Sequence, residues 1–118
     1  MSYKQNIGKY GQEVARKWLQ ARDYNFLAAN FSTRHGELDL IFEKNKQIIF
    51  VEVKTRLSDK FGLPEEAVTE QKKAKMSEAG LKYLAANQIA SDNYRFDIVA
   101  VEIDKANKKA KIRHHKGI

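Results

Sequence analysis

Residues 36–54 read GELDLIFEKNKQIIFVEVK and contain two apolar runs on either side of Asn45-Lys46. Both runs are rich in the branched and aromatic residues that β-strands favour. A connection of two residues between two such runs is typical of an antiparallel hairpin. The stretch therefore predicts two paired strands, 37–43 and 47–54.

The register of this hairpin places two acidic residues opposite each other. If Lys44 opposes Gln47, the numbers of directly opposed residues sum to 91, so Asp39 lies opposite Glu52. Opposed residues of an antiparallel pair have Cβ atoms about 4.5–5.5 Å apart. Alternation along each strand then predicts one wholly apolar face, made of Leu38, Leu40, Phe42, Ile49, Val51 and Val53. The other face carries Glu37, Asp39, Glu52 and Lys54, followed by Ile41, Ile48 and Phe50.

The rest of the chain predicts two helices and three further strands around the hairpin. Apolar residues at helical spacing predict a helix over 6–22, and we expect Gly8 and Gly11 inside it to mark close approach of another backbone. A strand over 26–31 and a turn over 32–36 lead into the hairpin. A loop over 55–63 follows it, and Pro64, with Glu65 and Glu66, predicts a helix over 64–87. The last strands are expected at 95–103 and 110–114, with a turn over 104–107.

This order, α-β-β-β-α-β-β, predicts an α/β fold with a mixed central sheet flanked by helices. A helix that links two strands allows them to pair in parallel, so we expect some parallel pairing across the second helix. The chain of 118 residues is expected to form one domain, 1–118, because it has no linker and is 42% hydrophobic.

Composition restricts the class of protein. There is no cysteine, which excludes disulfides, thiolate metal sites and a cysteine nucleophile. No apolar run approaches the roughly 20 residues of a membrane span, and residues 1–6 lack the apolar stretch of a signal peptide. These features predict a cytoplasmic protein without a membrane partner.

The charge of the chain favours a polyanionic partner. Lysine and arginine number 22 against 15 acidic residues, which gives a formal net charge of +7. The excess lies in residues 1–22 and from Lys105 onward, whereas residues 35–52 are mainly acidic. A basic protein with one acidic region suggests a polyanionic partner, with the electrostatic field reversed at one spot. Charge that only maintains solubility is the alternative.

The opposed carboxylates are the strongest chemical signal. Two acids facing each other are destabilising unless a cation neutralises them, and oxygen ligands suit Mg²⁺ or Mn²⁺. Lys54 lies on the same face as Glu52, and a lysine beside a metal-binding pair is what phosphodiester hydrolysis requires. The alternative is a solvated polar face in which Glu37 and Lys54 form an ordinary cross-strand pair.

These residues also carry a family resemblance. The segments Gly36-Glu37-Leu38-Asp39-Leu40-Ile41 and Phe50-Val51-Glu52-Val53-Lys54-Thr55-Arg56 resemble the PD-(D/E)XK nuclease superfamily, which has the restriction-endonuclease-like fold. More narrowly, the chain resembles the bacterial YraN family, which is related to archaeal-type Holliday junction resolvases. The likeness covers nearly the whole chain and includes Gly8-x-x-Gly11-x-Glu13, Asn30, Gly62-x-Pro64-x-Glu66-Ala67-Val68-x-x-x-Lys72, Tyr83-Leu84 and Arg95-Phe96-Asp97.

The resemblance implies roles for four residues. Asp39 and Glu52 would ligate a divalent metal, Mg²⁺ or Mn²⁺, and Lys54 would assist the attacking water. Glu13 would be an auxiliary acid at the site, although its position beside the apolar stripe of its helix is equally consistent with a solvated glutamate. Leu38 stands where the superfamily name has proline, and this departure affects no ligand.

Basic residues near the hairpin are candidate nucleic-acid contacts. Arg34, Arg56 and Lys60 lie in segments next to the hairpin ends and could contact phosphates. Lys72 shares a helical stripe with Val68, Met76, Ala79 and Tyr83, so it either extends to the rim or places its ammonium near the acidic site. Ordinary surface charge is the alternative for each of them.

Together these features predict a metal-dependent nuclease acting on DNA, with branched, Holliday-junction-like DNA among the candidate substrates. A nucleic-acid-binding protein that keeps the fold without cleavage is the second hypothesis, and an assembly module for an acidic protein is the third. Cleavage of both strands of a junction would favour a homodimer.

Overall fold

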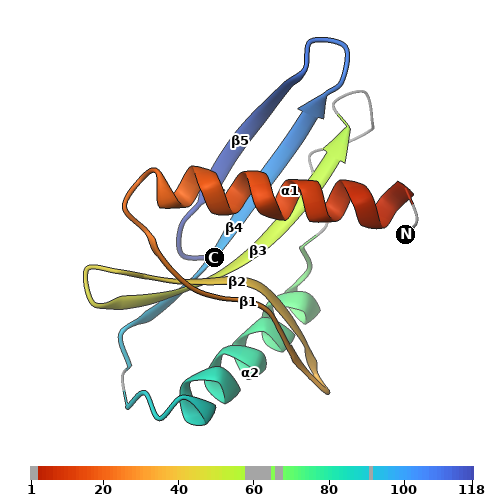
Figure 1. Cartoon of the computed structure of the whole chain (residues 1–118). Helices are drawn as coiled ribbons and strands as arrows, with labels where there is room; N and C mark the ends of the chain where they lie inside the picture. Colours follow the sequence, from red (N-terminus) through yellow and green to blue (C-terminus); the bar gives the residue numbers. More distant parts are fainter. Residues whose placement is uncertain (1–2, 58–64, 66–67, 91) are drawn as a thin grey trace.

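The structure is a computed structural model that describes residues 3–57, 65, 68–90 and 92–118 (Figure 1). Two helices and five strands follow one another in the predicted order. They are α1 (Tyr3–Gln20), β1 (Asn25–Thr33), β2 (Gly36–Lys44), β3 (Gln47–Leu57), α2 (Glu70–Ala86), β4 (Tyr94–Asp104) and β5 (Lys109–His115). Among the described residues, neither helix is both long enough and apolar enough to cross a membrane.

The five strands form one mixed sheet, which confirms the predicted α/β class. The strands lie in sequence order, β1-β2-β3-β4-β5. All neighbouring strands are antiparallel except β3 and β4, which are parallel and are joined through α2. The parallel pair was predicted from the helix between the two strands.

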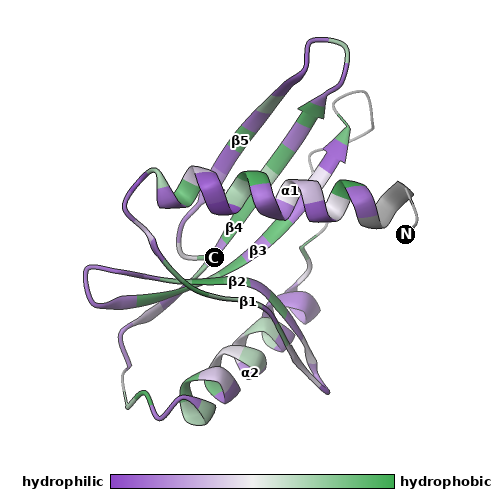
Figure 2. Cartoon of the chain, in the orientation of Figure 1, coloured by the Kyte–Doolittle hydropathy of each residue, from purple (hydrophilic) through white to green (hydrophobic). Residues whose placement is uncertain are grey.

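Each helix covers one side of the sheet and closes its own core (Figures 1 and 2). Ala15 and Leu19 of α1 pack with Ile49 and Val51 of β3. The alternate residues of β3 pack with α2, in a cluster made of Leu38, Ile41, Ile48, Phe50, Met76, Ala79, Tyr83 and Leu84. Because β3 is apolar on both sides, it lies at the centre of the molecule.

The hairpin between β2 and β3 has the predicted register. The paired residues run from Lys44↔Gln47 to Leu40↔Val51. Asn45 and Lys46 have φ of 51° and 66°, and two successive positive values are typical of the two-residue turn that matches strand twist. Leu40↔Val51 is the last pair at this end of the ladder. Asp39 and Glu52 are the next residues on each strand, so their predicted opposition is not part of the paired ladder.

Leu38 was wrongly assigned to the same face as Leu40. The structure buries it in the α2 cluster instead. Asn30 lies between the pairs Ala29↔Leu40 and Phe31↔Leu38 and has a φ of 54°. A left-handed residue inside a strand twists it locally, and this one lies beside the point where β2 departs from strict alternation.

Two element boundaries also differ from the prediction. The helix predicted to begin at Pro64 begins at Glu70, where Thr69 is the N-cap and its side chain accepts a hydrogen bond from the Lys72 amide. Pro64 and Glu66 lie outside the described residues, while Glu65 pairs with Arg113 and not with a helix end. Residues 55–57 belong to β3 and not to a loop, since they continue the pairing with β4.

The two glycines of α1 have different roles. A Cβ on Gly11 would lie 1.8 Å from Thr55 Oγ1 and 2.7 Å from Thr55 Cβ, whereas a Cβ on Gly8 would meet nothing within 4 Å. The expected close approach therefore exists at Gly11 alone, and it involves a side chain of β3. Gly11 lets α1 cross the strand that carries Glu52 and Lys54.

We expect Gly11→Ala to destabilise the fold by on the order of 2 kcal/mol, because α1 must move away from β3. Gly8→Ala is the matched control and should be neutral or stabilising by up to about 1 kcal/mol, since alanine is the better helix former. Urea unfolding of both variants measures the difference. Equal stabilities would contradict the proposed close packing at Gly11.

Candidate functional site

The candidate site lies where β2 and β3 separate, on the side of the sheet that α2 covers. Asp39 Oδ2 accepts a hydrogen bond of 2.8 Å from the backbone N–H of Val53. The last backbone pair of β2 and β3 is Leu40↔Val51. Beyond it, the Asp39 side chain accepts the hydrogen bond of the Val53 amide. This bond fixes the Asp39 carboxylate against β3, next to the residue that carries the second acid.

Glu52 is a buried carboxylate with unequal oxygens. The residue is only 4% exposed. Its Oε1 lies 3.7 Å from Lys54 Nζ and 3.5 Å from Lys72 Nζ. Its Oε2 is buried and has no hydrogen-bond partner among the described residues. A buried oxygen without a partner is costly, so this atom is the natural ligand for a group that the protein alone does not supply.

The electrostatics show that the two acids share one low-dielectric space. Burial, followed by the charge of Glu52, raises the pKa of Asp39 to about 7, although the Val53 amide and Lys72 act in the opposite direction. Burial also raises the pKa of Glu52, against the lowering effect of Lys72 and Lys54. Burial therefore disfavours the ionised forms of both carboxylates, and the two lysines offset this effect only in part.

Lys72 is brought to the site by the start of α2. The Thr69 cap holds the Lys72 amide at 3.1 Å, so the side chain leaves the first turn of the helix beside Glu52. Met76, Ala79 and Tyr83 of the same stripe are buried as expected. Of the two interpretations of Lys72, the structure supports the one that places its ammonium at the acidic site.

Glu13 lies apart from this group. It belongs to α1, on the other side of the sheet, and forms ion pairs with Arg16 and with Lys17. The hydrogen bond from Arg16 is the main reason why the pKa of Glu13 lies below its ordinary value. The structure thus brings Glu13 together with its helix neighbours, while Asp39, Glu52, Lys54 and Lys72 gather elsewhere.

The other predicted contacts are dispersed. Arg34 is exposed in the turn before β2, and Arg56 lies on β3 opposite Glu102, two residues after Lys54. Lys60 lies outside the described residues. Glu37 accepts a hydrogen bond of 3.1 Å from Ser32, and Lys54 pairs with Glu52.

The donor set available to a metal consists of two carboxylates. Among the described residues, no three His, Cys, Asp or Glu side chains gather closely enough to form a metal site by themselves. Mg²⁺ is often held by one or two carboxylates, with waters and substrate phosphates as its other ligands. Asp39 and Glu52 fit that mode of binding and do not fit a closed structural site.

Another buried acid, Asp97, belongs to the architecture. It pairs with Arg95 at 2.8 Å. It also contacts His114 Nε2 at 2.7 Å and accepts a 3.0 Å bond from the Gly117 amide. Burial raises the pKa of Asp97, but these bonds outweigh it and hold the value below its ordinary range. The His114 and Gly117 contacts could not be predicted from sequence patterns, because both depend on the pairing of β4 with β5.

The raised pKa of Asp39 predicts a pH-dependent stability. Between about pH 4 and pH 7 the folded state retains a proton that the unfolded state releases, so stability falls as the pH rises through this range. Asp39→Asn keeps an acceptor for Val53 and removes the charge. We expect it to match the wild type near pH 4 and to be more stable at pH 8 by on the order of 2 kcal/mol.

Urea unfolding at both pH values measures this effect, and Glu43→Gln, an exposed acid on the same strand, is the control. A difference between Asp39→Asn and wild type that stays constant with pH would contradict the raised pKa.

Comparison with known proteins places the chain among bacterial relatives of the same length. A protein from Syntrophomonas wolfei, named UPF0102 protein, is 43% identical over 108 residues, which cover 92% of each chain. A protein of the same name from Alkaliphilus oremlandii is 42% identical, and the alignment covers 92% of each chain. Another from Beutenbergia cavernae is 38% identical, and the alignment covers 100% of this chain and 99% of the relative. The model of "Uncharacterised protein family UPF0102" matches residues 11–101, which include Asp39, Glu52, Lys54 and Lys72. The chain therefore belongs to the UPF0102 family.

Proposed function

We propose that this chain is a divalent-metal-dependent nuclease of the PD-(D/E)XK type that hydrolyses phosphodiester bonds in DNA. The observation that carries the proposal is the buried Glu52 Oε2, which has no partner among the described residues, beside the Asp39 carboxylate and two lysines. The order of helices and strands is consistent with the restriction-endonuclease-like fold that the sequence resemblance implies.

The residues present fit a hard divalent cation. Two carboxylates in a buried space that disfavours their ionised forms would bind Mg²⁺ or Mn²⁺ and become fully ionised on doing so. Asp39 and Glu52 would hold the ion, which supplies polarisation of the scissile phosphate and acidification of a water. Asp39 is already oriented by the Val53 amide, so little reorganisation is needed.

The two lysines have separate tasks in this proposal. Lys54 follows Glu52 on the same strand face, and its ammonium can donate to the attacking water while carrying positive charge toward the phosphate. Lys72 approaches Glu52 from α2, where it holds the carboxylate in place and offsets negative charge that develops on the phosphate. As the water oxygen bonds to phosphorus it releases a proton to solvent, the bond to the leaving oxygen breaks, and that oxygen takes up a proton from solvent.

The charge of the chain supports a nucleic acid as the substrate class, and the sequence resemblance supports DNA within it. The formal net charge of +7 favours a polyanion, and Arg34 and Arg56 are candidate phosphate contacts near the ends of the hairpin. Branched DNA is the finer proposal, derived from the likeness to junction resolvases, and a homodimer is the assembly that would suit it.

A nucleic-acid-binding protein without cleavage is the second candidate. It is favoured by the contacts of Lys54 and Lys72 with Glu52, since two ammonium groups can partly neutralise the acids without a metal. The two functions differ in metal binding and in turnover. Incubation with linear, flapped and four-way DNA and with structured RNA, in Mg²⁺ or Mn²⁺, separates them, and binding without any cleavage would favour the second.

We expect Mn²⁺ to bind the wild type in titration calorimetry and Asp39→Asn to lose this binding, because a neutral amide is a much poorer ligand. Glu43→Gln is the control and should bind as the wild type does. Equal binding by the wild type and Asp39→Asn would remove the metal site from the proposal.

Glu52→Gln and Lys54→Ala should impair cleavage in different ways. Glu52→Gln should abolish cleavage but keep or strengthen metal-free DNA binding, because one negative charge beside the phosphate is removed. Lys54→Ala should keep Mn²⁺ binding and lower the cleavage rate by about 10²–10³-fold, the scale for loss of one electrostatic stabiliser. Lys54→Arg should not restore the rate fully, since a planar guanidinium cannot replace a compact ammonium.

Lys72→Ala should also slow cleavage, whereas Lys73→Ala, which removes a lysine paired with Glu70 on the same helix, should not. Single-turnover assays and DNA-binding titrations measure these effects. Wild-type cleavage rates in the Glu52 and Lys54 variants would show that any observed activity arises elsewhere.

A further inference from the structure

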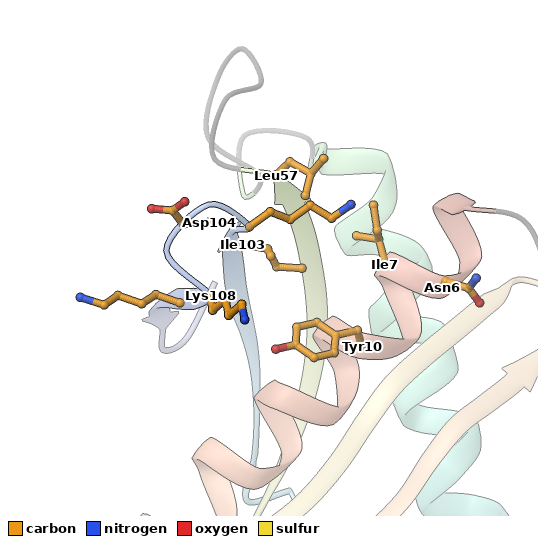
Figure 3. A pocket seen from close by; sticks show the side chains of 9 residues that line it. Asn6, Ile7, Tyr10, Leu57, Ile103, Asp104 and Lys108 are labelled. Carbon is orange, nitrogen blue, oxygen red and sulfur yellow. The ribbon is translucent and has the colours of Figure 1, made fainter.

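A pocket lies on the side of the sheet that α1 covers, away from Glu52. The first half of α1 and the far ends of β3 and β4 enclose a volume of about 380 Å³ (Figure 3). Its apolar walls are formed by Ile7, Tyr10, Leu57 and Ile103. A volume of roughly 300–1,000 Å³ is usual for ligand sites. The pocket can therefore accept one or two large apolar side chains.

The rim of this pocket is basic. Lys105, Lys108 and Lys109 border it from the turn between β4 and β5 and from the start of β5, against the single acid Asp104. Both oxygens of Asp104 are held in the turn by Asn107, whose backbone N–H and side-chain amide donate at 3.2 and 2.8 Å. A ligand at the rim therefore meets an excess of positive charge.

Tyr10 adds an exposed apolar surface beside the rim. Its side chain is 55% exposed although it stands next to Ile7 and Leu57 in the pocket. A partly exposed tyrosine with apolar neighbours is a common anchor in protein interfaces, because its ring buries a large area with little loss of conformational freedom. The pocket thus combines an apolar anchor site with a cationic border.

We propose that this pocket docks an acidic peptide segment of a partner protein, with one bulky apolar side chain in the pocket and carboxylates on the rim lysines. Charge complementarity selects an anionic ligand, and the apolar walls select the peptide over nucleic acid. A nucleobase in the pocket would place its polar edges against Ile7, Leu57 and Ile103, and unpaired buried polar groups are costly. An apolar side chain has no such groups.

The docking site is independent of the proposed nuclease site. Val53 of β3 packs in the α1 cluster, whereas Glu52 and Lys54 face α2 and Lys72. Leu57 shares the α1 side with Val53 by strand alternation. Peptide binding should therefore be the same in Glu52→Gln as in the wild type, and the failure of either proposal leaves the other intact.

Fluorescence anisotropy with a labelled peptide that carries four aspartates and one phenylalanine tests the inference on the full chain, in EDTA. We expect saturable binding that is lost when the phenylalanine of the peptide is replaced by alanine. Tyr10→Ala and Lys108→Glu should each weaken binding by about tenfold, the scale of a good interface contact. Leu81→Ala and Lys82→Glu, which change an equally exposed apolar residue and a lysine on α2, are the matched controls and should have no effect.

Three results would overturn the proposal. The first is the absence of peptide binding when the protein concentration reaches about 1 mM, because any binding missed there is too weak to matter. The second is binding that Tyr10→Ala leaves unchanged, since the pocket would not then be the docking site. The third is displacement of the peptide by a single-stranded oligonucleotide whose own affinity falls in Tyr10→Ala, because the pocket would then serve nucleic acid.

Discussion

The hydrogen bond from the Val53 backbone N–H to Asp39 Oδ2 is the contact on which the site depends. A backbone amide in a central strand must find an acceptor, and here a side chain takes that role beyond the last backbone pair of β2 and β3. This bond fixes Asp39 beside Glu52. The same bond favours the ionised form of Asp39, against a burial that disfavours it. One hydrogen bond therefore both positions the Asp39 carboxylate and favours its ionised form.

Most of the fold could be predicted because its signals are local. The two-residue turn fixed the hairpin register, and a helix between two strands indicated the parallel pair. The start of α2 could not be predicted, because Pro64 and Glu65 imitate a helix start while Glu65 is held by Arg113 of β5, far along the chain. The last three residues of β3 were missed for the same reason, since their partners lie on β4. Leu38 was misplaced because the prediction assumed strict alternation along β2, which is interrupted beside the left-handed Asn30 of β1.

The part of the candidate site that lies on the β2–β3 hairpin could be predicted from the sequence. Asp39, Glu52 and Lys54 are grouped by strand register alone. Lys72 was ambiguous, because a lysine that extends to solvent and one that reaches an acid share the same helical pattern; only the position of α2 against β3 separates them. Glu13 entered through family resemblance; its pairs with Arg16 and Lys17 are local to α1, and the placement of α1 on the other side of the sheet keeps Glu13 apart from Glu52. Tertiary placement of the helices decides which charges meet.

The parallel pairing of β3 and β4 has a consequence for how the protein folds. β2 and β3 are neighbours in the chain, so their hairpin closes a short loop and is expected early, whereas the pairing of β4 with β3 must close a loop that contains the whole of α2 and is expected later. Until then β3 presents one unpaired edge of a strand that is apolar on both sides, which is a template for association with other chains. Glu52 and Lys54 interrupt this apolar run near its end, and charges in such positions oppose aggregation. The residues proposed for chemistry therefore also protect the nascent sheet during the interval before β4 docks.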